Sequence, residues 1–181
     1  MARLVKEIVV TEKLDGTNAQ IFIADDSQPI TLKSGRVVPF LVGSRTRWVY
    51  PENDNHGFAT WAYAHVDGLL KLGPGRHFGE WWGQGIQRNY GLKEKRFSLF
   101  NAIRWATRAE DSAFHVVPIL YQGLFDTEAI QDVFENLSLR GSVAAPGFMN
   151  PEGIVVYHVA GNVGFKKTFG GDGHKGLDIV A

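Results

Sequence analysis

The sequence has no cysteine in its 181 residues. This absence excludes disulfide bonds, zinc fingers, iron–sulfur clusters and catalysis by a thiol. The sequence also lacks an apolar run near the ~20 residues that a membrane-spanning helix needs, and its first residues lack the apolar core of a signal peptide. We therefore expect a cytoplasmic protein that has no membrane partner.

A net charge is absent as well, because 19 lysine and arginine residues balance 19 aspartate and glutamate residues. A neutral chain argues against a protein whose whole surface binds nucleic acid. The charges are nevertheless uneven. Eight basic residues lie in the middle of the chain, namely Lys71, Arg76, Arg88, Lys93, Lys95, Arg96, Arg104 and Arg108. Such a segment is typical of a face that follows phosphates, but also of ordinary solvated surface, and both interpretations stay open here.

The composition that is present indicates a folded globular protein, with 44% hydrophobic and 21% charged residues. The length suits one large domain or two small ones. Strand and helix patterns follow one another without a linker, a repeat or a low-complexity block. This order predicts a single α+β domain over residues 1–181, built from antiparallel sheets flanked by helices.

The segment Thr11–Asn18 follows an apolar run, Ile8–Val10, and precedes an alternating one, Ala19–Ile23. Its Asp15-Gly16 dipeptide readily adopts the positive φ angles of a tight turn, so we predict a β-hairpin here. The hairpin would leave Lys13 at the end of a strand, beside the turn. A lone lysine at such a place is usually a surface charge; the alternative is a nucleophilic amine that attacks phosphorus or a carbonyl carbon.

Other periodic patterns predict further elements, by the spacing of apolar residues and the position of glycines. They are a helix over 56–72 with His65 packed in the core, strands over 76–82, 96–104 and 115–121, a surface loop over 83–91, a helix from a cap at Asp126 to Gly141, and a hairpin of residues 151–159 and 163–169.

Six short motifs complete the pattern. They are Lys13-Leu14-Asp15-Gly16, Gly43-Ser44-Arg45, Phe78-Gly79-Glu80, Phe97-Ser98-Leu99-Phe100, Glu152-Gly153-Ile154-Val155-Val156 and Gly164-Phe165-Lys166-Lys167. In this order they resemble the motif series of the covalent nucleotidyltransferases, which comprise ATP-dependent DNA ligases, RNA ligases and mRNA-capping guanylyltransferases. The resemblance is strongest to the RNA ligase family. The first motif of that family typically reads Glu-Lys-x-x-Gly-Thr-Asn, as Glu12 to Asn18 do here.

The resemblance implies a ligase that uses ATP together with Mg²⁺ or Mn²⁺. Lys13 would attack the α-phosphate of ATP, expel pyrophosphate and form a lysyl–AMP intermediate. The adenylate would then pass to a nucleic-acid 5′-phosphate, and a 3′-hydroxyl would displace AMP to seal the strand. The partner would be RNA ends or nicks, with DNA as an alternative. Phosphoryl transfer of this kind depends mainly on positioning and on charge neutralisation.

The resemblance also assigns roles to individual residues. The ATP-binding set would be Glu12, Lys13, Asn18, Glu80, Phe100, Lys166 and Lys167. Within it, Glu80 would bind the ribose hydroxyls and Phe100 would stack on adenine. Arg45 would take the substrate 5′-phosphate, Glu152 would hold the metal, and Asp15 and Gly16 would form the turn that orients Lys13. The alternatives are a core role for Phe100, a strand-end charge for Glu80 and a turn role for Asn18.

The sequence departs from the family pattern at three places. Asn101 stands where an acid usually follows the stacking aromatic. The last motif has adjacent lysines where the family has two lysines separated by one residue; we favour Lys166 as the phosphate ligand, with Thr168 in the second position. Only a short segment follows the last motif, so we expect no OB-fold. The chain would then be either a minimal single-domain ligase or the catalytic core of a longer one.

Three functions remain open from the sequence. An RNA ligase is favoured by the Gly-Thr-Asn continuation and by the missing OB-fold. A minimal ATP-dependent DNA ligase would use the same six motifs. A nucleotide- or RNA-binding module that has lost ligation is favoured by the adjacent lysines. We expect a monomer in each case.

Overall fold

A computed structural model describes residues 6–25, 28–107 and 113–170. The chain divides into two compact units. Unit 1 takes the described parts of residues 1–15, 90–92 and 117–181, and unit 2 takes those of residues 16–89 and 93–116. The basic residue Arg108 lies outside the described residues.

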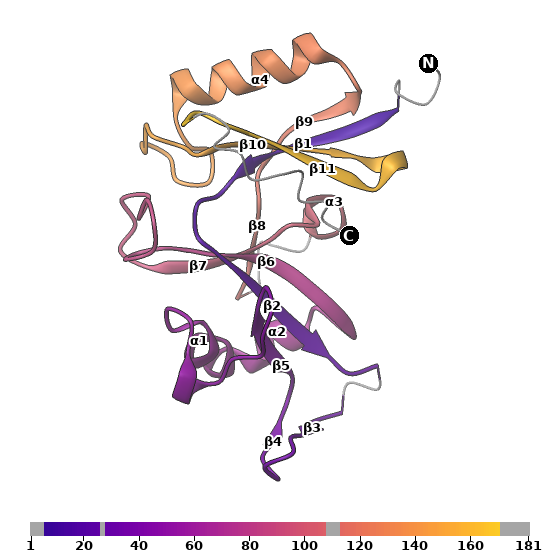
Figure 1. Ribbon diagram of the computed structural model, residues 1–181, viewed down its shortest axis with the longest axis vertical. Coiled ribbons are helices and arrows are strands. Elements are labelled where there is room, and N and C mark those ends of the chain that lie inside the picture. Colours follow the sequence, from indigo (N-terminus) through magenta and orange to yellow (C-terminus); the bar gives the residue numbers. More distant parts are fainter. Residues whose placement is uncertain (1–5, 26–27, 108–112, 171–181) are drawn as a thin grey trace. The chain divides into compact units, whose positions relative to one another are not determined.

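Unit 1 is an antiparallel sheet covered by one long helix. Its elements are β1 (Glu7–Lys13), β9 (Ile119–Leu124), α4 (Thr127–Arg140), β10 (Gly153–His158), the 3₁₀ turn η2 (Val159–Gly161) and β11 (Val163–Thr168). The sheet order is β11-β10-β1-β9, and α4 runs along one face of it (Figure 1). Residues Ile8, Val10, Ile154 and Val156 pack against Leu137 of α4 in this core. Because alternate residues of a strand share a face, these four side chains all point toward the helix.

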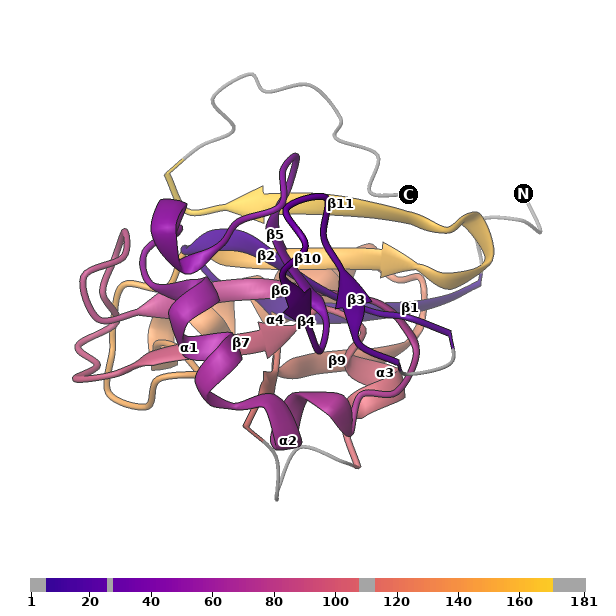
Figure 2. The same cartoon turned by 90° about the horizontal axis from the view of Figure 1, so that it is seen from below.

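Unit 2 is a second sheet with short helices on one side. Its elements are β2 (Thr17–Ile23), β3 (Ile30–Thr31), β4 (Val37–Val38), β5 (Leu41–Ser44), η1 (Pro51–Asn53), α1 (Phe58–Ala64), α2 (Val66–Leu70), β6 (Gly75–Gly83), β7 (Lys95–Leu99), α3 (Ala102–Trp105) and β8 (His115–Val116). The main sheet has the order β5-β2-β6-β7-β8, and β3 pairs with β4. Figure 2 shows α1 and α2 in front of this sheet. They contribute Phe58, Ala62 and Leu69 to a core shared with Ile21 and Trp81.

These two sheets confirm the predicted α+β fold with antiparallel sheets. One pair, β7 with β8, is parallel. The predicted helix capped by Asp126 is confirmed, since the Asp126 carboxylate accepts hydrogen bonds from the N–H groups of Glu128 and Ala129. The last predicted hairpin is confirmed as β10 and β11, and the strand predicted over 76–82 is confirmed as β6.

The hairpin predicted at Asp15-Gly16 is wrong. Strand β1 pairs with β9 and β10, whereas β2 pairs with β5 and β6, so the two strands belong to different sheets. Nor does Gly16 adopt a positive φ. A Cβ on Gly16 would instead lie 2.4 Å from the carbonyl oxygen of Trp81 and 2.7 Å from the Cβ of Trp82. Glycine is therefore required at this position by close packing and not by a turn conformation.

The helix predicted over 56–72 is two helices, α1 and α2, which are separated at His65. The predicted core position of His65 is also wrong, because its side chain is exposed. Its ring stacks on that of Trp61 at 4.9 Å, and its Nδ1 lies 2.8 Å from the Trp61 carbonyl oxygen. These local contacts hold His65 at the helix break.

Two predicted strands are shorter than expected. The strand predicted over 96–104 ends at Leu99, because Asn101 caps the short helix α3 and accepts a hydrogen bond from the N–H of Arg104 at 3.3 Å. The strand predicted over 115–121 divides into β8 and β9, with Pro118 between them. Proline lacks the N–H that a sheet ladder needs, which accounts for the interruption.

Candidate active site

Lys13 is the last residue of β1, and its amine forms an ion pair with Glu152. The Nζ of Lys13 lies 2.5 Å from Oε1 of Glu152, and the two side chains are 20% and 16% exposed. The sheet register explains this ion pair, because Lys13 lies opposite Gly153 of the neighbouring strand β10, and Glu152 directly precedes Gly153. The pair holds an amine and a carboxylate at one strand end, with limited access to water. Both residues were assigned to the site from the family motifs.

Glu12, the residue before Lys13, is fully buried, and its carboxylate holds a loop. Its Oε1 accepts from the hydroxyl of Ser142 at 2.5 Å, and its Oε2 accepts from the N–H groups of Val143 and Ala144 at 2.8 and 2.9 Å. Burial raises the pKa of the Glu12 carboxyl, and these hydrogen bonds offset part of that rise. The described contacts of the Glu12 side chain thus fix the loop after α4 to β1, and its contact with ATP stays a prediction.

Tyr90 is a buried residue of unit 1 that the sequence did not identify. Its hydroxyl accepts a hydrogen bond from the N–H of Asp15 at 2.8 Å. Its ring lies 4.8 Å from that of Phe148. Burial raises the pKa of the Tyr90 hydroxyl, which is therefore neutral at physiological pH. The only signal in the sequence was its glycine-rich loop, which we interpreted as surface. The loop backbone has positive φ angles at Gln87, Asn89 and Tyr90.

The adjacent lysines of β11 point to opposite faces of the sheet. Lys166 lies opposite Val155 and Lys167 opposite Ile154. Strand alternation therefore puts Lys166 on the same face as Lys13. Lys167 lies on the α4 face, where its Nζ donates to Oε1 of Gln131 at 2.5 Å and sits 4.5 Å from the ring centroid of Phe134.

In unit 2, Asn18 and Glu80 are direct partners across β2 and β6. Oε1 of Glu80 accepts from the N–H of Gly16 at 3.1 Å. Oδ1 of Asn18 is buried and has no hydrogen-bond partner among the described residues. A buried acceptor without a donor is costly, so this oxygen suits a ligand hydroxyl or a metal-bound water.

Phe100 follows β7 directly, and its side chain is 38% exposed. The alternative of a core position therefore does not apply to it. Its N–H donates to the carbonyl of Phe78 at 3.0 Å, which fixes its backbone beside β6. Arg45 lies exposed in the turn after β5, which is closed by a hydrogen bond from the N–H of Ser44 to the Arg47 carbonyl.

The described residues contain no cluster of three or more His, Cys, Asp or Glu side chains that could enclose a metal ion. Magnesium does not need such a cage, because it commonly uses one or two carboxylates, several waters and the phosphates of a substrate. The single carboxylate of Glu152 beside Lys13 fits that kind of site.

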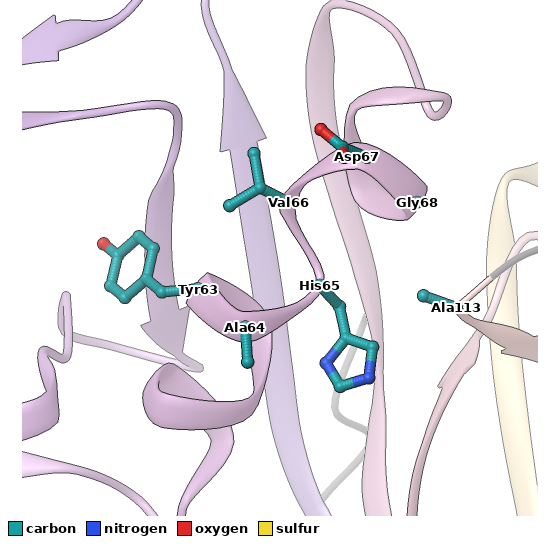
Figure 3. Close-up of a pocket in the computed structure, with 7 residues that line it drawn as sticks. All are labelled: Tyr63, Ala64, His65, Val66, Asp67, Gly68 and Ala113. Carbon is teal, nitrogen blue, oxygen red and sulfur yellow. The ribbon is translucent and has the colours of Figure 1, made fainter.

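A pocket of about 200 Å³ lies elsewhere, where α1 turns into α2 (Figure 3). Its lining residues are Tyr63, Ala64, His65, Val66, Asp67, Gly68 and Ala113. The candidate site residues are not among them. Within the described part of the chain, each helix is too short or too polar to cross a membrane.

Solved structures of RNA ligases share this fold. A variant of Naegleria gruberi RNA ligase with ATP and manganese matches at a TM-score of 0.64 and 22% identity, over 92% of this chain and 51% of that chain. An apo variant of the same enzyme matches at 0.63 and 22%, over 92% and 50%. A variant with AMP and manganese matches at 0.59 and 20%, over 92% and 51%. The chain thus spans about half the length of these structures.

The sequence itself gives the family. The model of the RNA ligase family matches residues 6–169, and the chain belongs to this family. A comparison with curated proteins found no match.

Proposed function

We propose that the protein is an ATP-dependent polynucleotide ligase that acts on RNA through Lys13. The observation that carries the proposal is the ion pair of Lys13 and Glu152 at the end of β1, inside a chain of the RNA ligase family. Support for ATP and a divalent metal comes from two of the N. gruberi RNA ligase structures, one with ATP and manganese and one with AMP and manganese.

The proposed reaction has three transfers at phosphorus. The amine of Lys13 loses a proton and attacks the α-phosphorus of ATP, so that an N–P bond forms and the bond to pyrophosphate breaks. An oxygen of a 5′-phosphate then attacks the same phosphorus and releases the lysine. Finally a 3′-hydroxyl attacks the activated 5′-phosphate, which forms the phosphodiester and releases AMP.

The residues of unit 1 would serve the phosphates. Lys166 shares a sheet face with Lys13 and would neutralise charge on the α-phosphate, with Thr168 adding a hydroxyl on the same face. Glu152 would hold a divalent cation, which when bound would neutralise phosphate charge. Asp15 would orient the lysine, its own N–H being fixed by Tyr90.

The residues of unit 2 would serve the nucleoside and the substrate. Glu80 and Asn18 would bind ribose hydroxyls or a metal-bound water, and the unpartnered Oδ1 of Asn18 supports this role. Phe100 would stack on adenine and Arg45 would bind the 5′-phosphate. The family match runs through both units, in support of one nucleotidyltransferase domain over residues 1–181. A monomeric state and a cytoplasmic location remain predictions.

The decisive experiment is the intact mass of the protein after incubation with ATP and magnesium. We expect the mass to rise by one AMP in the wild type and to stay unchanged in Lys13→Ala. An equal yield of adduct in Lys13→Ala would disprove the mechanism. A wild type that binds ATP without forming an adduct would favour the nucleotide-binding module that has lost ligation. The hydrogen bond from Lys167 to Gln131 of α4 also supports that alternative, because it holds one of the two adjacent lysines on the helix face.

The choice between RNA and DNA needs a second experiment. Matched nicked duplexes would differ only in the sugar of the terminal 3′-hydroxyl nucleotides, since the 2′-hydroxyl is what distinguishes the two polymers. We expect faster sealing of the ribose-terminated strand. Equal or faster sealing of the all-DNA nick would identify a minimal DNA ligase instead.

A further inference from the structure

A cluster of aromatic and basic side chains shares a sheet face with Asn18 and Glu80 in unit 2. The register pairs Asn18 with Glu80, Gln20 with Phe78 and Phe22 with Arg76. Alternation places these six residues on one face, and the buried core residues Ala19, Ile21 and Trp81 on the other. Arg76 lies four residues along β6 from Glu80, a separation of roughly 13 Å at the usual rise of a strand.

Arg76 is held in place without an acidic partner. Its guanidinium carbon lies 5.2 Å from the ring centroid of Trp48 and 5.7 Å from that of Phe22. Its Nη1 donates to Oε1 of Gln20 at 3.1 Å. Arg76 is nevertheless exposed, and no ion pair joins it to an acidic residue in the described part of the chain. A planar cation is therefore fixed in orientation and open to solvent.

The cluster is built into the sheet. A Cβ on Gly43 would lie 2.9 Å from the ring of Trp48 and 3.0 Å from Cγ of Gln20, so the missing side chain lets Trp48 pack onto this face. The amide nitrogen of Gln20 donates to the carbonyl of Ser44 at 2.6 Å, which fixes the amide that orients Arg76. The Arg76 guanidinium is therefore held by two neighbouring rings, whose centroids are 6.4 Å apart, and by the Gln20 amide.

Two exposed residues adjoin Arg76 and Trp48, one on the same strand face and one in the sequence. Phe78, two residues after Arg76 on the same face of β6, is 41% exposed. Arg47, the residue before Trp48, is exposed and has no acidic partner among the described residues. The simplest structural interpretation is that Arg76 shields the rings of Phe22 and Trp48 from water. That interpretation does not account for the exposed Phe78 on the same face, nor for the exposed Arg47 next to Trp48 in the sequence.

We propose that Arg76, Phe78 and Arg47 bind single-stranded polynucleotide. One unpaired base stacks on the ring of Phe78 and a second on the guanidinium plane of Arg76, while Arg47 takes a phosphate. Aromatic rings and arginine planes are the surfaces on which unpaired bases stack, and nearby cations track the backbone. The inference rests on the proposed function, because it places the substrate strand on the sheet face that carries the nucleoside-binding residues.

The test measures the anisotropy of a fluorescent single-stranded RNA of about ten nucleotides, a length within the usual site size of such surfaces. The full chain is compared with Arg76→Gln, Arg76→Lys, Phe78→Ala and the control Arg36→Gln. Arg36 matches Arg76 because its guanidinium lies 4.9 Å from the ring of Tyr50, but Arg36 is neutralised by Glu52 at 2.5 Å. Thermal melting of each variant shows whether it is folded.

We expect Arg76→Gln and Phe78→Ala to weaken RNA binding by roughly 5- to 100-fold, as loss of one stacked base does elsewhere. Arg76→Lys, which keeps the charge and loses the plane, should also weaken it, and Arg36→Gln should not. Wild-type affinity in Arg76→Lys and Phe78→Ala would overturn the proposal, as would equal losses in Arg36→Gln. Adenylation is read in parallel by intact mass, so failure of the wild type to accept AMP would count against the proposed function and not against this cluster.

Discussion

The hydroxyl of Tyr90 accepts a hydrogen bond from the backbone N–H of Asp15, two residues after Lys13. The two residues are 75 positions apart in the sequence. The buried ring of Tyr90 packs on Phe148, so the position of the hydroxyl is fixed. The segment that carries the proposed nucleophile is therefore held from one side by a rigid aromatic residue.

Tyr90→Phe should destabilise the protein by about 1–3 kcal/mol, because it leaves the N–H of Asp15 without its acceptor. It should also slow adenylation at saturating ATP without weakening ATP binding. Urea denaturation and the rate of adduct formation measure the two effects. Tyr157→Phe is the control, since that hydroxyl bonds to Asn162 on the exposed surface and its loss should change stability by under about 0.5 kcal/mol. Identical results for the two variants would contradict the positioning role.

Lys166→Ala should slow adenylation by about 10²-fold, the usual effect of losing one group that stabilises transition-state charge. Lys167→Ala should leave the rate near that of the wild type. It should lower stability by about 0.5–1 kcal/mol through the lost contact with the ring of Phe134. Single-turnover adenylation and denaturation of both variants provide the measurement. A larger kinetic defect in Lys167→Ala would reverse the assignment.

Phe100→Ala should weaken ATP binding by roughly 5- to 100-fold if the ring stacks on adenine. Isothermal titration calorimetry with the Lys13→Ala background, which cannot form the adduct, gives the affinity directly. Ile103→Ala is a suitable control because Ile103 is an exposed apolar residue of the neighbouring helix α3. If both substitutions leave the affinity unchanged, Phe100 has no role in binding the nucleoside.

The free energy of unfolding should fall as the pH falls, because His77 is buried in the folded protein. Burial lowers the pKa of this side chain below the ordinary histidine value of about 6.5, aided by the charge of Arg104. The unfolded chain therefore binds a proton near pH 6.5 while the folded chain does not, so stability is lost as the pH falls from there toward the lowered pKa. Melting temperatures between pH 7.5 and 5 should drop more steeply in the wild type than in His77→Gln. Parallel curves would contradict the prediction.

Local signals predicted the elements that depend on local contacts. Asp126 and Gly141 mark the two ends of α4, as predicted, because a capping side chain and a positive-φ glycine act within one helical turn. The hairpin of β10 and β11 likewise follows from a short turn, at Asn162 with φ 48°. The motif resemblance then named Lys13 and Glu152, which the structure brings together.

Two of the misses come from contacts between distant residues, and a third comes from a local ring contact. Asp15-Gly16 has the composition of a tight turn, but the partners of β1 come from the C-terminal part of the chain, and the packing of Trp81 and Trp82 decides the residue at Gly16. The glycine-rich loop did not reveal the role of Tyr90, because its hydrogen-bond partner Asp15 lies 75 positions away in the sequence. The break at His65 depends on its stacking with Trp61, which the helical pattern of apolar residues does not reveal.

The pairing of β1 with later strands limits when the sheet of unit 1 can form during synthesis. Ile8 and Val10 are made before the strands of unit 2, whereas their neighbours in the sheet, His158 and Val156, are made after them. The sheet of unit 2, by contrast, uses strands from residues 17 to 116 only. During synthesis β1 therefore stays unpaired until β9 and β10 have been made. An unpaired apolar strand can bind chaperones or pair with other chains and aggregate.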